Sequence, residues 1–287
     1  MSCIICKAKS EKLKFEYQGA FFKKCTICGL VRTLPFPPKL KIINHYRDKF
    51  KKGNYKTLLA HMNSYSYVYK GFIRLLKRRI GNLSGKRILD VGCFTADFLD
   101  LAKKDGAVVY GIELQKEAYE IARKKHGNKI KNCSFEKASF KWKFDIITMF
   151  GLIEHTVHPD ALIESAVRWL KKDGILIIQT PNTRSILAKI LGKFWPPYVP
   201  IEHIHYFSDL NIKKFLRRYG FSNIKCTPHI KFLTLQYLYD MLETFGSEFR
   251  WMIRPFLNCM PQKFHKLKIP LYGGEMLVTA LKAQPSK

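Results

Sequence analysis

Acidic side chains and long apolar runs are both scarce in this sequence. Asp and Glu together number 22 against 51 Lys and Arg, which leaves a formal net charge of +29. No uninterrupted apolar run reaches the roughly 18 residues that a membrane-spanning helix needs. The chain opens on a cysteine pair instead of a charged segment followed by an apolar core, so no secretory leader is expected. These absences predict a cytoplasmic protein, with a peripheral position at a membrane kept open.

The positive charge is concentrated at the two ends of the chain. Residues 1–87 carry 21 Lys and Arg against 3 Asp and Glu, residues 88–183 carry 14 against 13, and residues 184–287 carry 16 against 6. Basic flanks of this kind attract polyanions such as RNA, a phosphorylated glycan or an anionic membrane surface. A lysine-rich, solvated surface without a partner is the other interpretation.

Four cysteines form two closely spaced pairs at the front of the chain. They are Cys3, Cys6, Cys25 and Cys28. Two Cys-x-x-Cys pairs can bind one Zn²⁺ tetrahedrally, and four thiolates leave no open position, so the predicted zinc is structural. Unrelated buried thiols and disulfides are the alternatives. The other four cysteines are scattered singly, which favours zinc.

Prolines at 35, 37 and 38 oppose both helix and central strand. We therefore place a zinc ribbon at residues 1–38 and a basic helical linker or cap at 39–84. Apolar residues between 65 and 80 recur at intervals of three and four, which predicts one buried helical face.

From residue 85 onward, apolar strands and amphipathic helices alternate, which predicts a parallel sheet with helices on both faces. The 85–287 domain includes an apolar segment without strand alternation, predicted as a helical insertion near 232–268. The predicted strands are 88–91, 108–113, 130–135, 144–150, 175–179 and 275–282, and the predicted helices include 116–125, 160–170 and 208–220.

The stretch 87–101 runs from a buried strand through a small-residue turn into a helix, with Thr95 as the expected N-cap. Such a unit binds nucleotide-like ligands at the carboxyl end of the strand. Glu113 ends the next strand, where a carboxylate can accept hydrogen bonds from both ribose hydroxyls. A dinucleotide fingerprint would have glycine at Phe94 and Asp97, and an aspartate opposes a phosphate. The turn therefore favours a nucleoside ligand without pyrophosphate.

At residues 85–282 the sequence resembles the class I S-adenosylmethionine-dependent methyltransferases. Asp90-Val91-Gly92-Cys93 matches their first motif, Gly111-Ile112-Glu113 their ribose-binding acid, and Phe144-Asp145-Ile146-Ile147 their fourth strand. Glu154-His155, the segment 170–174 and Gln179-Thr180-Pro181-Asn182 resemble the ubiquinone-methyltransferase-like branch. Residues 25–31, the prolines and Glu202-His203-Ile204-His205 resemble a subset with a zinc-containing front end, whose members often act on sugars, surface glycans or small metabolites.

The resemblance implies a Rossmann-like, doubly wound, seven-stranded and mostly parallel sheet that binds S-adenosylmethionine. The implied cofactor-binding residues are Asp90, Gly92, Cys93, Phe94, Glu113, Leu114 and Phe150. The family turn usually reads Gly-x-Gly-x-Gly, whereas Phe94 and Ala96 replace the second and third glycines here. Phe94 is expected to crowd the turn or to force a backbone conformation that glycine adopts more easily.

Methyl transfer is an in-line displacement in which the enzyme aligns donor and acceptor, and a base assists when the acceptor is a hydroxyl. His155, after the fourth strand, and His203 and His205, after the fifth, are the candidate catalytic residues. The alternative for each is a hydrogen-bonded histidine that orders its loop. The apolar, aromatic and basic stretch 186–200 has three interpretations: a lid over the acceptor, a patch that contacts a membrane surface, or a segment packed in the core or in a dimer interface.

The preferred function is methyl transfer to oxygen of a small-molecule, sugar or glycan, or lipid-linked acceptor. An RNA base methyltransferase is the second hypothesis, supported by the basic zinc-ribbon segment. Gly151 to Glu154 stand where many such enzymes carry an Asn/Asp-Pro-Pro-Tyr/Phe motif, which opposes it. The third hypothesis is a non-catalytic binding protein whose altered turn no longer takes the cofactor.

Overall fold

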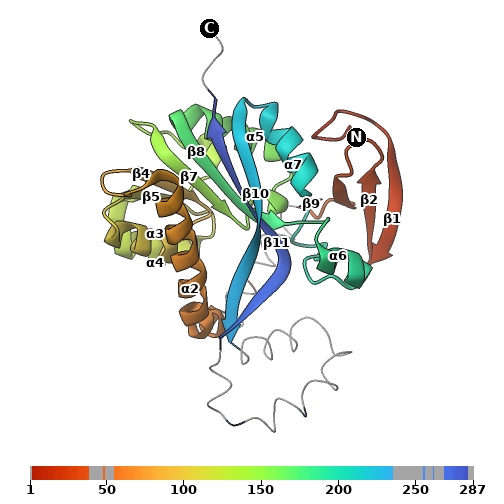
Figure 1. The fold of residues 1–287 in the computed structure, drawn as a ribbon, viewed down its shortest axis with the longest axis horizontal. Helices are drawn as coiled ribbons and strands as arrows, with labels where there is room; N and C mark the ends of the chain where they lie inside the picture. Colours follow the sequence, from red (N-terminus) through yellow and green to blue (C-terminus); the bar gives the residue numbers. More distant parts are fainter. Residues whose placement is uncertain are drawn as a thin grey trace.

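The computed structural model describes residues 2–38, 55–234 and 268–283, with isolated positions at 48, 255 and 261. A seven-stranded sheet forms its centre (Figure 1). The strands are β4 (Arg87–Val91), β5 (Val108–Ile112), β6 (Ile130–Lys131), β7 (Phe144–Phe150), β8 (Leu170–Pro181), β10 (Phe221–Thr234) and β11 (Lys268–Lys282).

The order of these strands is β10-β11-β8-β7-β4-β5-β6. Neighbours from β8 to β6 pair in parallel, and β11 pairs antiparallel with both β8 and β10. Only one strand of the sheet therefore runs against the others. This confirms the predicted Rossmann-like, mostly parallel, seven-stranded sheet.

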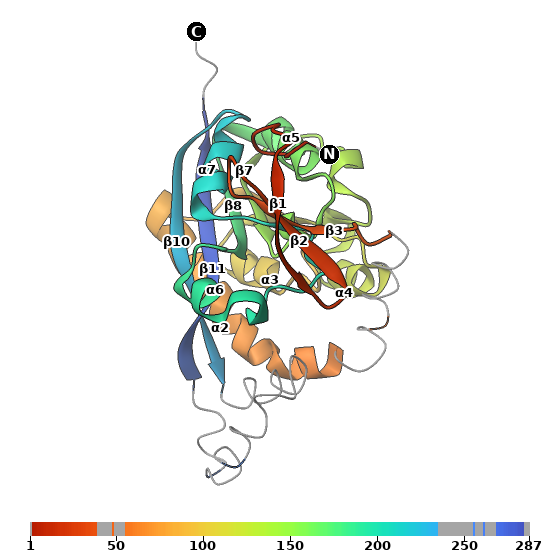
Figure 2. The same ribbon diagram turned by 90° about the vertical axis from the view of Figure 1, so that its right-hand side faces the viewer.

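Helices cover both faces of the sheet, as Figures 1 and 2 show. On one face, α2 (Tyr55–Ile80), α3 (Asp97–Lys104) and α4 (Lys116–His126) bury apolar side chains such as Phe72, Phe98 and Ala122. On the other face, α5 (Pro159–Trp169) and α7 (Asp209–Arg217) bury Ile163 and Phe215. The alternation of strands and helices along the chain produces these two layers because each parallel connection must cross a face.

A smaller sheet contains the first three strands of the chain and one later strand. It consists of β1 (Glu11–Tyr17), β2 (Ala20–Cys25), β3 (Val31–Leu34) and β9 (His205–Tyr206), in that order. Residues 2–38, which we call the cysteine module, lie beside α7 and β9 in Figure 1. Because β9 belongs to the connection after β8, the module shares a sheet with the larger domain.

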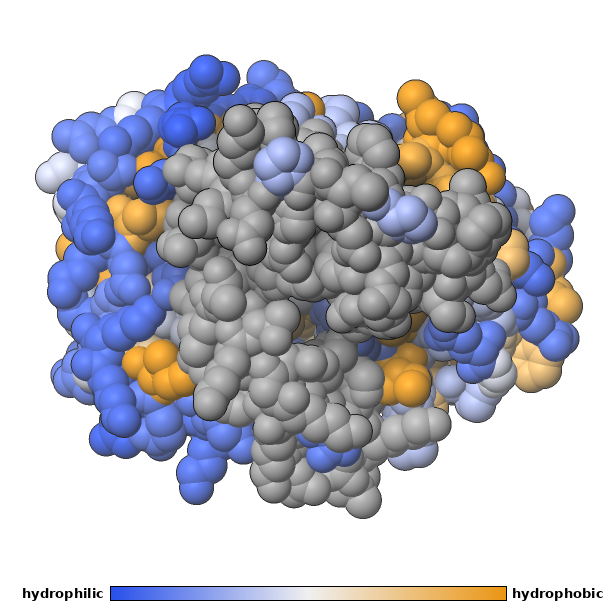
Figure 3. All heavy atoms as spheres, turned by 90° about the horizontal axis from the view of Figure 1, so that it is seen from below, coloured by the Kyte–Doolittle hydropathy of each residue, from blue (hydrophilic) through white to orange (hydrophobic). Residues whose placement is uncertain are grey.

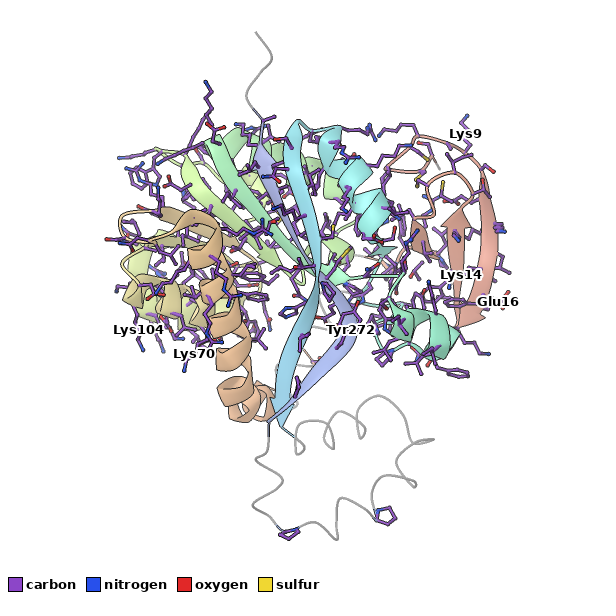
Figure 4. The ribbon with its side chains drawn as sticks, viewed as in Figure 1. Lys9, Lys14, Glu16, Lys70, Lys104 and Tyr272 are labelled. Atoms are coloured by element: carbon purple, nitrogen blue, oxygen red, sulfur yellow. The ribbon has the colours of Figure 1, made fainter. Side chains whose placement is uncertain are left out.

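The module also shares an apolar core with that domain. Cys3, Ile5 and Leu30 belong to the same buried cluster as Phe207 and Phe215. The Arg218 guanidinium donates hydrogen bonds to the carbonyls of Ile4 and Ile5 at 3.0 and 2.5 Å. The ammonium group of Lys14, labelled on β1 in Figure 4, donates to the Tyr198 hydroxyl at 3.2 Å. The two parts pack as one body.

Three local expectations differ from the structure. The third predicted strand, 130–135, is only Ile130–Lys131. Thr95 is not the N-cap of α3, because Ala96 holds that position in a left-handed conformation and the Thr95 hydroxyl donates to the Asp97 carboxylate. The predicted insertion near 232–268 begins and ends in strand, since β10 reaches Thr234 and β11 starts at Lys268. The rest of that insertion and residues 39–47 and 49–54 lie outside the described residues.

The surface is largely hydrophilic where it is described. On the face shown in Figure 3, the apolar residues gather in separate patches. Ile186, Ile190 and Phe194, on α6 (Ile186–Leu191) and the following short helix η5 (Gly192–Phe194), are 69%, 72% and 54% exposed. Among the described helices, none has both the length and the apolar character needed to cross a bilayer.

Candidate functional site

The turn after β4 has a left-handed backbone at every second residue. Gly92, Phe94 and Ala96 have φ angles of 77°, 48° and 64°. These are the positions of the three glycines in a Gly-x-Gly-x-Gly turn. A non-glycine residue in this region costs about 1 to 3 kcal/mol, and surrounding contacts must hold it there. The expectation that Phe94 adopts a glycine-like conformation is therefore confirmed.

Hydrogen bonds from the turn to β5 hold this conformation. The backbone N–H groups of Gly92 and Cys93 both donate to the carbonyl of Ile112, at 2.8 and 3.0 Å. The N–H of Phe94 donates to Oε2 of Glu113 at 2.8 Å. The carbonyl of Ile112 and the side chain of Glu113 thus hold the backbone from Gly92 to Phe94.

Glu113 is half-buried at the carboxyl end of β5, where the sequence places the ribose-binding acid. Its Oε1 accepts a hydrogen bond from the N–H of Gln115 at 2.8 Å, while Oε2 accepts the one from Phe94. Burial raises the pKa of Glu113, and the two N–H groups oppose that rise. A carboxylate has about four acceptor sites, so sites remain for two ribose hydroxyls. The carboxylate fits a nucleoside.

Asp90, the first residue of the first motif, is buried under the turn. The Thr148 hydroxyl on β7 donates to its Oδ1 at 2.6 Å. Burial raises the pKa of Asp90 to about 7, the Thr148 hydrogen bond lowers it, and the charge of Glu113 raises it further. Asp90 therefore changes its charge near neutral pH. No motif in the sequence indicates Thr148 as its partner.

The remaining predicted cofactor residues divide into buried and exposed positions. Cys93 is buried, and a Cβ atom at Gly111 would lie 2.6 Å from its sulfur, so a glycine is needed on β5 at that point. Leu114 is 66% exposed beside Glu113, where an apolar side chain is available to a flat base. Phe150, at the end of β7, is half-buried.

Phe150 belongs to a cluster of aromatic rings. Its ring stacks on Phe72 of α2 with centroids 4.1 Å apart and meets Phe98 edge-on at 5.0 Å. Tyr69 lies beside both Phe98 and Phe150, and His229 of β10 stacks on Phe72 at 4.8 Å. The expected buried face of the 65–80 helix is thus an aromatic wall at this edge of the sheet.

The charge of Asp97, which opposed a phosphate in the sequence, is paired in the structure. Lys125 of α4 contacts Asp97 and Asp100 at 2.8 and 2.9 Å. The carboxylate therefore presents less net charge to the turn than the sequence implied. The electrostatic argument against a phosphate ligand is correspondingly weaker.

Two of the three predicted catalytic histidines lie together. The ring centroids of His155 and His203 are 4.5 Å apart, with the rings at 75°. Nδ1 of His155 is 2.9 Å from the carbonyl of Glu202, and Nδ1 of His203 is 2.6 Å from that of Pro197. A carbonyl only accepts, so each neutral ring donates from Nδ1 and keeps the lone pair on Nε2.

The third predicted histidine, His205, lies apart from this pair. It is on β9, is 1% exposed and pairs in register with Arg32 of β3. Burial lowers its pKa to about 4. The ring therefore stays neutral at pH 7 and is too weak a base to take a proton from a hydroxyl.

Glu154 completes the surroundings of the histidine pair. It is 2% exposed, and the potential ligand atoms of Glu154, His155 and His203 all lie within 4.8 Å of one another. These three residues could hold a cation. Glu154 and His155 lie in the short helix Ile153–His155 after β7, close to Leu152, whose side chain would be 3.4 Å from a Cβ atom at Gly92. His155 thus lies on a segment that borders the cofactor turn, and His203 meets it from the connection after β8.

The four paired cysteines come together as predicted. Cys3 and Cys28 have sulfurs 3.4 Å apart, those of Cys6 and Cys25 are 3.5 Å apart, and all four lie within 4.8 Å of one another. Tetrahedral zinc with bonds of about 2.3 Å requires sulfurs about 3.8 Å apart, so the set fits this ion. The contact with Cys28 lowers the pKa of Cys3 to about 5 and raises that of Cys28.

The two cysteine pairs also have the same backbone turn. The N–H of Lys7 donates to the carbonyl of Cys3 at 2.8 Å, and that of Gly29 to the carbonyl of Cys25 at 3.0 Å. Lys7 and Gly29 both have left-handed φ angles, of 60° and 74°. The repeated turn brings the two sulfurs of each pair to one side.

Comparison with known proteins agrees with this geometry. The sequence pattern of the family described as "Methyltransferase domain" matches residues 62–226. A ubiquinone biosynthesis O-methyltransferase of Actinobacillus pleuropneumoniae is 30% identical over 135 residues, which are 43% of this chain and 57% of that protein. The chain thus spans little more than half the length of this curated relative.

Solved structures extend the similarity to nearly the whole described chain. A SAM-dependent methyltransferase of Thermotoga maritima has a TM-score of 0.54 at 20% identity and covers 83% of this chain and 99% of its own. A Burkholderia thailandensis 1,6-didemethyltoxoflavin-N1-methyltransferase, solved with S-adenosylhomocysteine bound, has a TM-score of 0.56 at 10% identity and covers 95% and 100%. At identities this low, the similarity to these structures shows the fold alone.

The fold is that of the class I S-adenosylmethionine-dependent methyltransferases. Because the family pattern covers more than half of its length, the chain belongs to the methyltransferase-domain family.

Proposed function

We propose that this protein transfers a methyl group from S-adenosylmethionine to an oxygen of a small-molecule, sugar or glycan, or lipid-linked acceptor. Family membership and the fit of Glu113 to a ribose support the cofactor. The observation that carries the reaction is the His155–His203 pair, whose Nδ1 atoms both face backbone carbonyls. In a neutral ring that donates from Nδ1, Nε2 is the basic atom.

The cofactor is held by the turn after β4 and by the end of β5. The proposed contacts are Asp90, Gly92, Cys93, Phe94, Glu113, Leu114 and Phe150. Glu113 accepts hydrogen bonds from the ribose, Leu114 covers the adenine, and the turn backbone faces the amino-acid end. S-adenosylmethionine supplies an electrophilic methyl group on its sulfonium.

His155 acts as the general base in this proposal. Its Nε2 takes the proton of the acceptor hydroxyl as that oxygen forms its bond to the methyl carbon, and the sulfur leaves with the electron pair of the broken S–C bond. Glu154 stabilises the imidazolium that forms because a carboxylate lies beside both rings. His203 orients the acceptor. His205 supports the connection from inside the protein, since its pKa of about 4 excludes proton transfer at neutral pH.

Cys3, Cys6, Cys25 and Cys28 bind one structural Zn²⁺ in this proposal. The sulfur separations of 3.4 and 3.5 Å and the paired turns support it. With all four positions filled by thiolate, the ion has no place for a substrate. Its role is to fix the cysteine module against α7.

The proposed acceptor class is supported by the names of the curated relatives and by exposed apolar side chains on α6. The curated relatives at about 30% identity are O-methyltransferases by name, and resemblance to the zinc-containing subset adds sugars and glycans. Exposed Ile186 and Ile190 on α6, flanking Lys189, support a peripheral contact with an anionic membrane and hence a lipid-linked acceptor.

Calorimetry with S-adenosylhomocysteine tests the cofactor site. We expect the wild-type protein to bind and Glu113→Ala to lose about 1.5 to 3 kcal/mol of binding free energy, the value of its charge-assisted hydrogen bonds. The matched control is Glu164→Ala, which removes an exposed carboxylate from α5 on the other face of the sheet. Absence of binding in the wild-type protein would support the non-catalytic alternative.

Release of S-adenosylhomocysteine on incubation with candidate acceptors tests the reaction. A catechol, a nucleotide-linked sugar and an isoprenoid phenol represent the three acceptor classes, and purified ribosomal RNA represents the alternative. Turnover with one of the first three supports the proposal. Turnover with RNA alone, together with binding that weakens steeply with salt, would replace it with RNA base methylation.

A further inference from the structure

The strand β3 of the cysteine module borders the connection that carries His203. Val31 pairs with Tyr206 and Arg32 with His205 in an antiparallel arrangement. The next residue, Thr33, continues this contact by its backbone and its side chain. Its N–H donates to the carbonyl of Ile204 at 3.0 Å, and its hydroxyl donates to the carbonyl of His203 at 3.1 Å.

Thr33 is therefore bonded to two successive carbonyls of that connection. It is 1% exposed, and the Tyr206 hydroxyl lies 3.4 Å from its own. The Thr33 hydroxyl thus helps to hold the backbone at His203, because without it this part-buried carbonyl loses a hydrogen-bond donor.

The same connection is bonded on its other side to the segment of His155. The N–H of Ile204 donates to the carbonyl of Glu154 at 2.7 Å. A line of hydrogen bonds thus runs from Thr33 through the 203–204 peptide to Glu154. The ring of His203 and the ring of His155 stand on the two segments that this line joins.

We infer that Thr33 is a positioning residue for the His155–His203 pair, so that the cysteine module sets the geometry of the acceptor side of the site. The inference rests on the proposed function only where it concerns the rate of methyl transfer. The effect of Thr33 on the placement of the two histidine rings can be measured without any turnover. On the cofactor side, the hydrogen bonds described above join the turn and Glu113 to each other, to Ile112 and to Gln115.

The test uses the full chain and the variant Thr33→Val, which keeps the shape and the backbone N–H but removes the hydroxyl. The first readout is the long-range ¹H–¹⁵N NMR spectrum of the histidine rings, which reports tautomer and environment. We expect the His203 signals, and those of His155 with them, to shift or broaden. Thr33→Ser restores the hydroxyl and should restore the wild-type signals.

Thr26→Val is the matched control because Thr26 lies in the same module and its hydroxyl bonds to Ser10 at an exposed position. It should leave the histidine signals unchanged. The dissociation constant for S-adenosylhomocysteine should change less than about twofold in every variant. If Thr33→Val does not fold, Thr33→Ala provides the same comparison.

On any acceptor that supports turnover, kcat of Thr33→Val should fall about 10- to 100-fold with the KM for S-adenosylmethionine unchanged, because a small misplacement of a reacting group is costly. A lower melting temperature with unchanged histidine signals would overturn the inference, since the module would then only add stability. If no acceptor reacts, the proposed function fails while the ring signals still decide the positioning role.

Discussion

The rings of His155 and His203 meet at 75° with their centroids 4.5 Å apart, although each stands on a different connection of the sheet. One follows β7 and the other follows β8. The carboxyl ends of parallel strands lie at one edge of a sheet, so side chains from separate loops converge there. The pair lies where two loops of the larger domain come together, and the loop that carries His203 also contacts β3 of the cysteine module.

Replacement of His155 by Asn tests the proposed base. Asn keeps a polar group of similar size but cannot take a proton, so kcat should fall by about 10²- to 10⁴-fold. Binding of S-adenosylhomocysteine, followed by calorimetry, should not change. The control is His158→Asn on the same loop, which lies outside the pair. Equal losses in both variants would show that the loop, and not the base, was disturbed.

Asp90 gives the protein a specific pH dependence. Its folded-state pKa of about 7 exceeds the ordinary value of 3.8, so between these values the folded protein holds a proton that the unfolded chain has lost. Stability therefore falls as pH rises from about 4 to about 7, by at most about 1.4 kcal/mol per pH unit from this group. Asp90→Asn should flatten the profile in urea unfolding from pH 5 to 7. The same slope in the variant would assign it to other groups.

Phe94 has a φ angle of 48°, which makes its tolerance of substitution depend on branching at Cβ. The side chains introduced by Phe94→Leu and Phe94→Ile are isomers of equal size. The β-branched isoleucine is far less compatible with a left-handed backbone. We expect Phe94→Ile to be about 1 to 2 kcal/mol less stable than Phe94→Leu in urea unfolding. Equal stabilities would mean that the turn relaxes to another conformation.

Removal of zinc should destabilise the whole body because Cys3 and Cys25 belong to its main core cluster. A free zinc concentration of 100 times the dissociation constant adds about 2.7 kcal/mol to stability. A strong chelator should lower the melting temperature, and Cys3→Ser should reduce the zinc content measured by mass spectrometry. Cys133→Ser, outside the set, should retain one equivalent. A zinc-free wild-type protein with the same melting temperature would contradict the prediction.

The strands β4, β5 and β7 were predictable because they are short apolar runs separated by turns and amphipathic helices. β10 was not among the individually predicted strands. β6 was not predicted correctly, since what ends it is a tertiary contact. The side-chain amide of Asn132 donates to the carbonyls of Glu113 and Leu114 and turns the chain away from the sheet. Local residue preference contains no information about that contact.

The cofactor turn and the cysteine set follow from spacing along the chain, so the sequence could identify both. The separation of His205 from the other two histidines could not be predicted. His203 and His205 differ by two positions, and only the pairing of β9 with β3 turns the second ring into the interior. Thr33 belongs to no recognisable motif. Its proposed positioning role depends on a contact with a residue 170 positions away in the sequence.

The pairing of β3 with β9 also constrains how the protein is made. Strands β1, β2 and β3 leave the ribosome before β9, so β3 has an open edge until the chain reaches His205 and Tyr206. Contacts of such long sequence separation form slowly, and unpaired edges favour aggregation in the interval. The nascent cysteine module must therefore wait for most of the larger domain before its sheet is complete, and early zinc capture would protect it during synthesis.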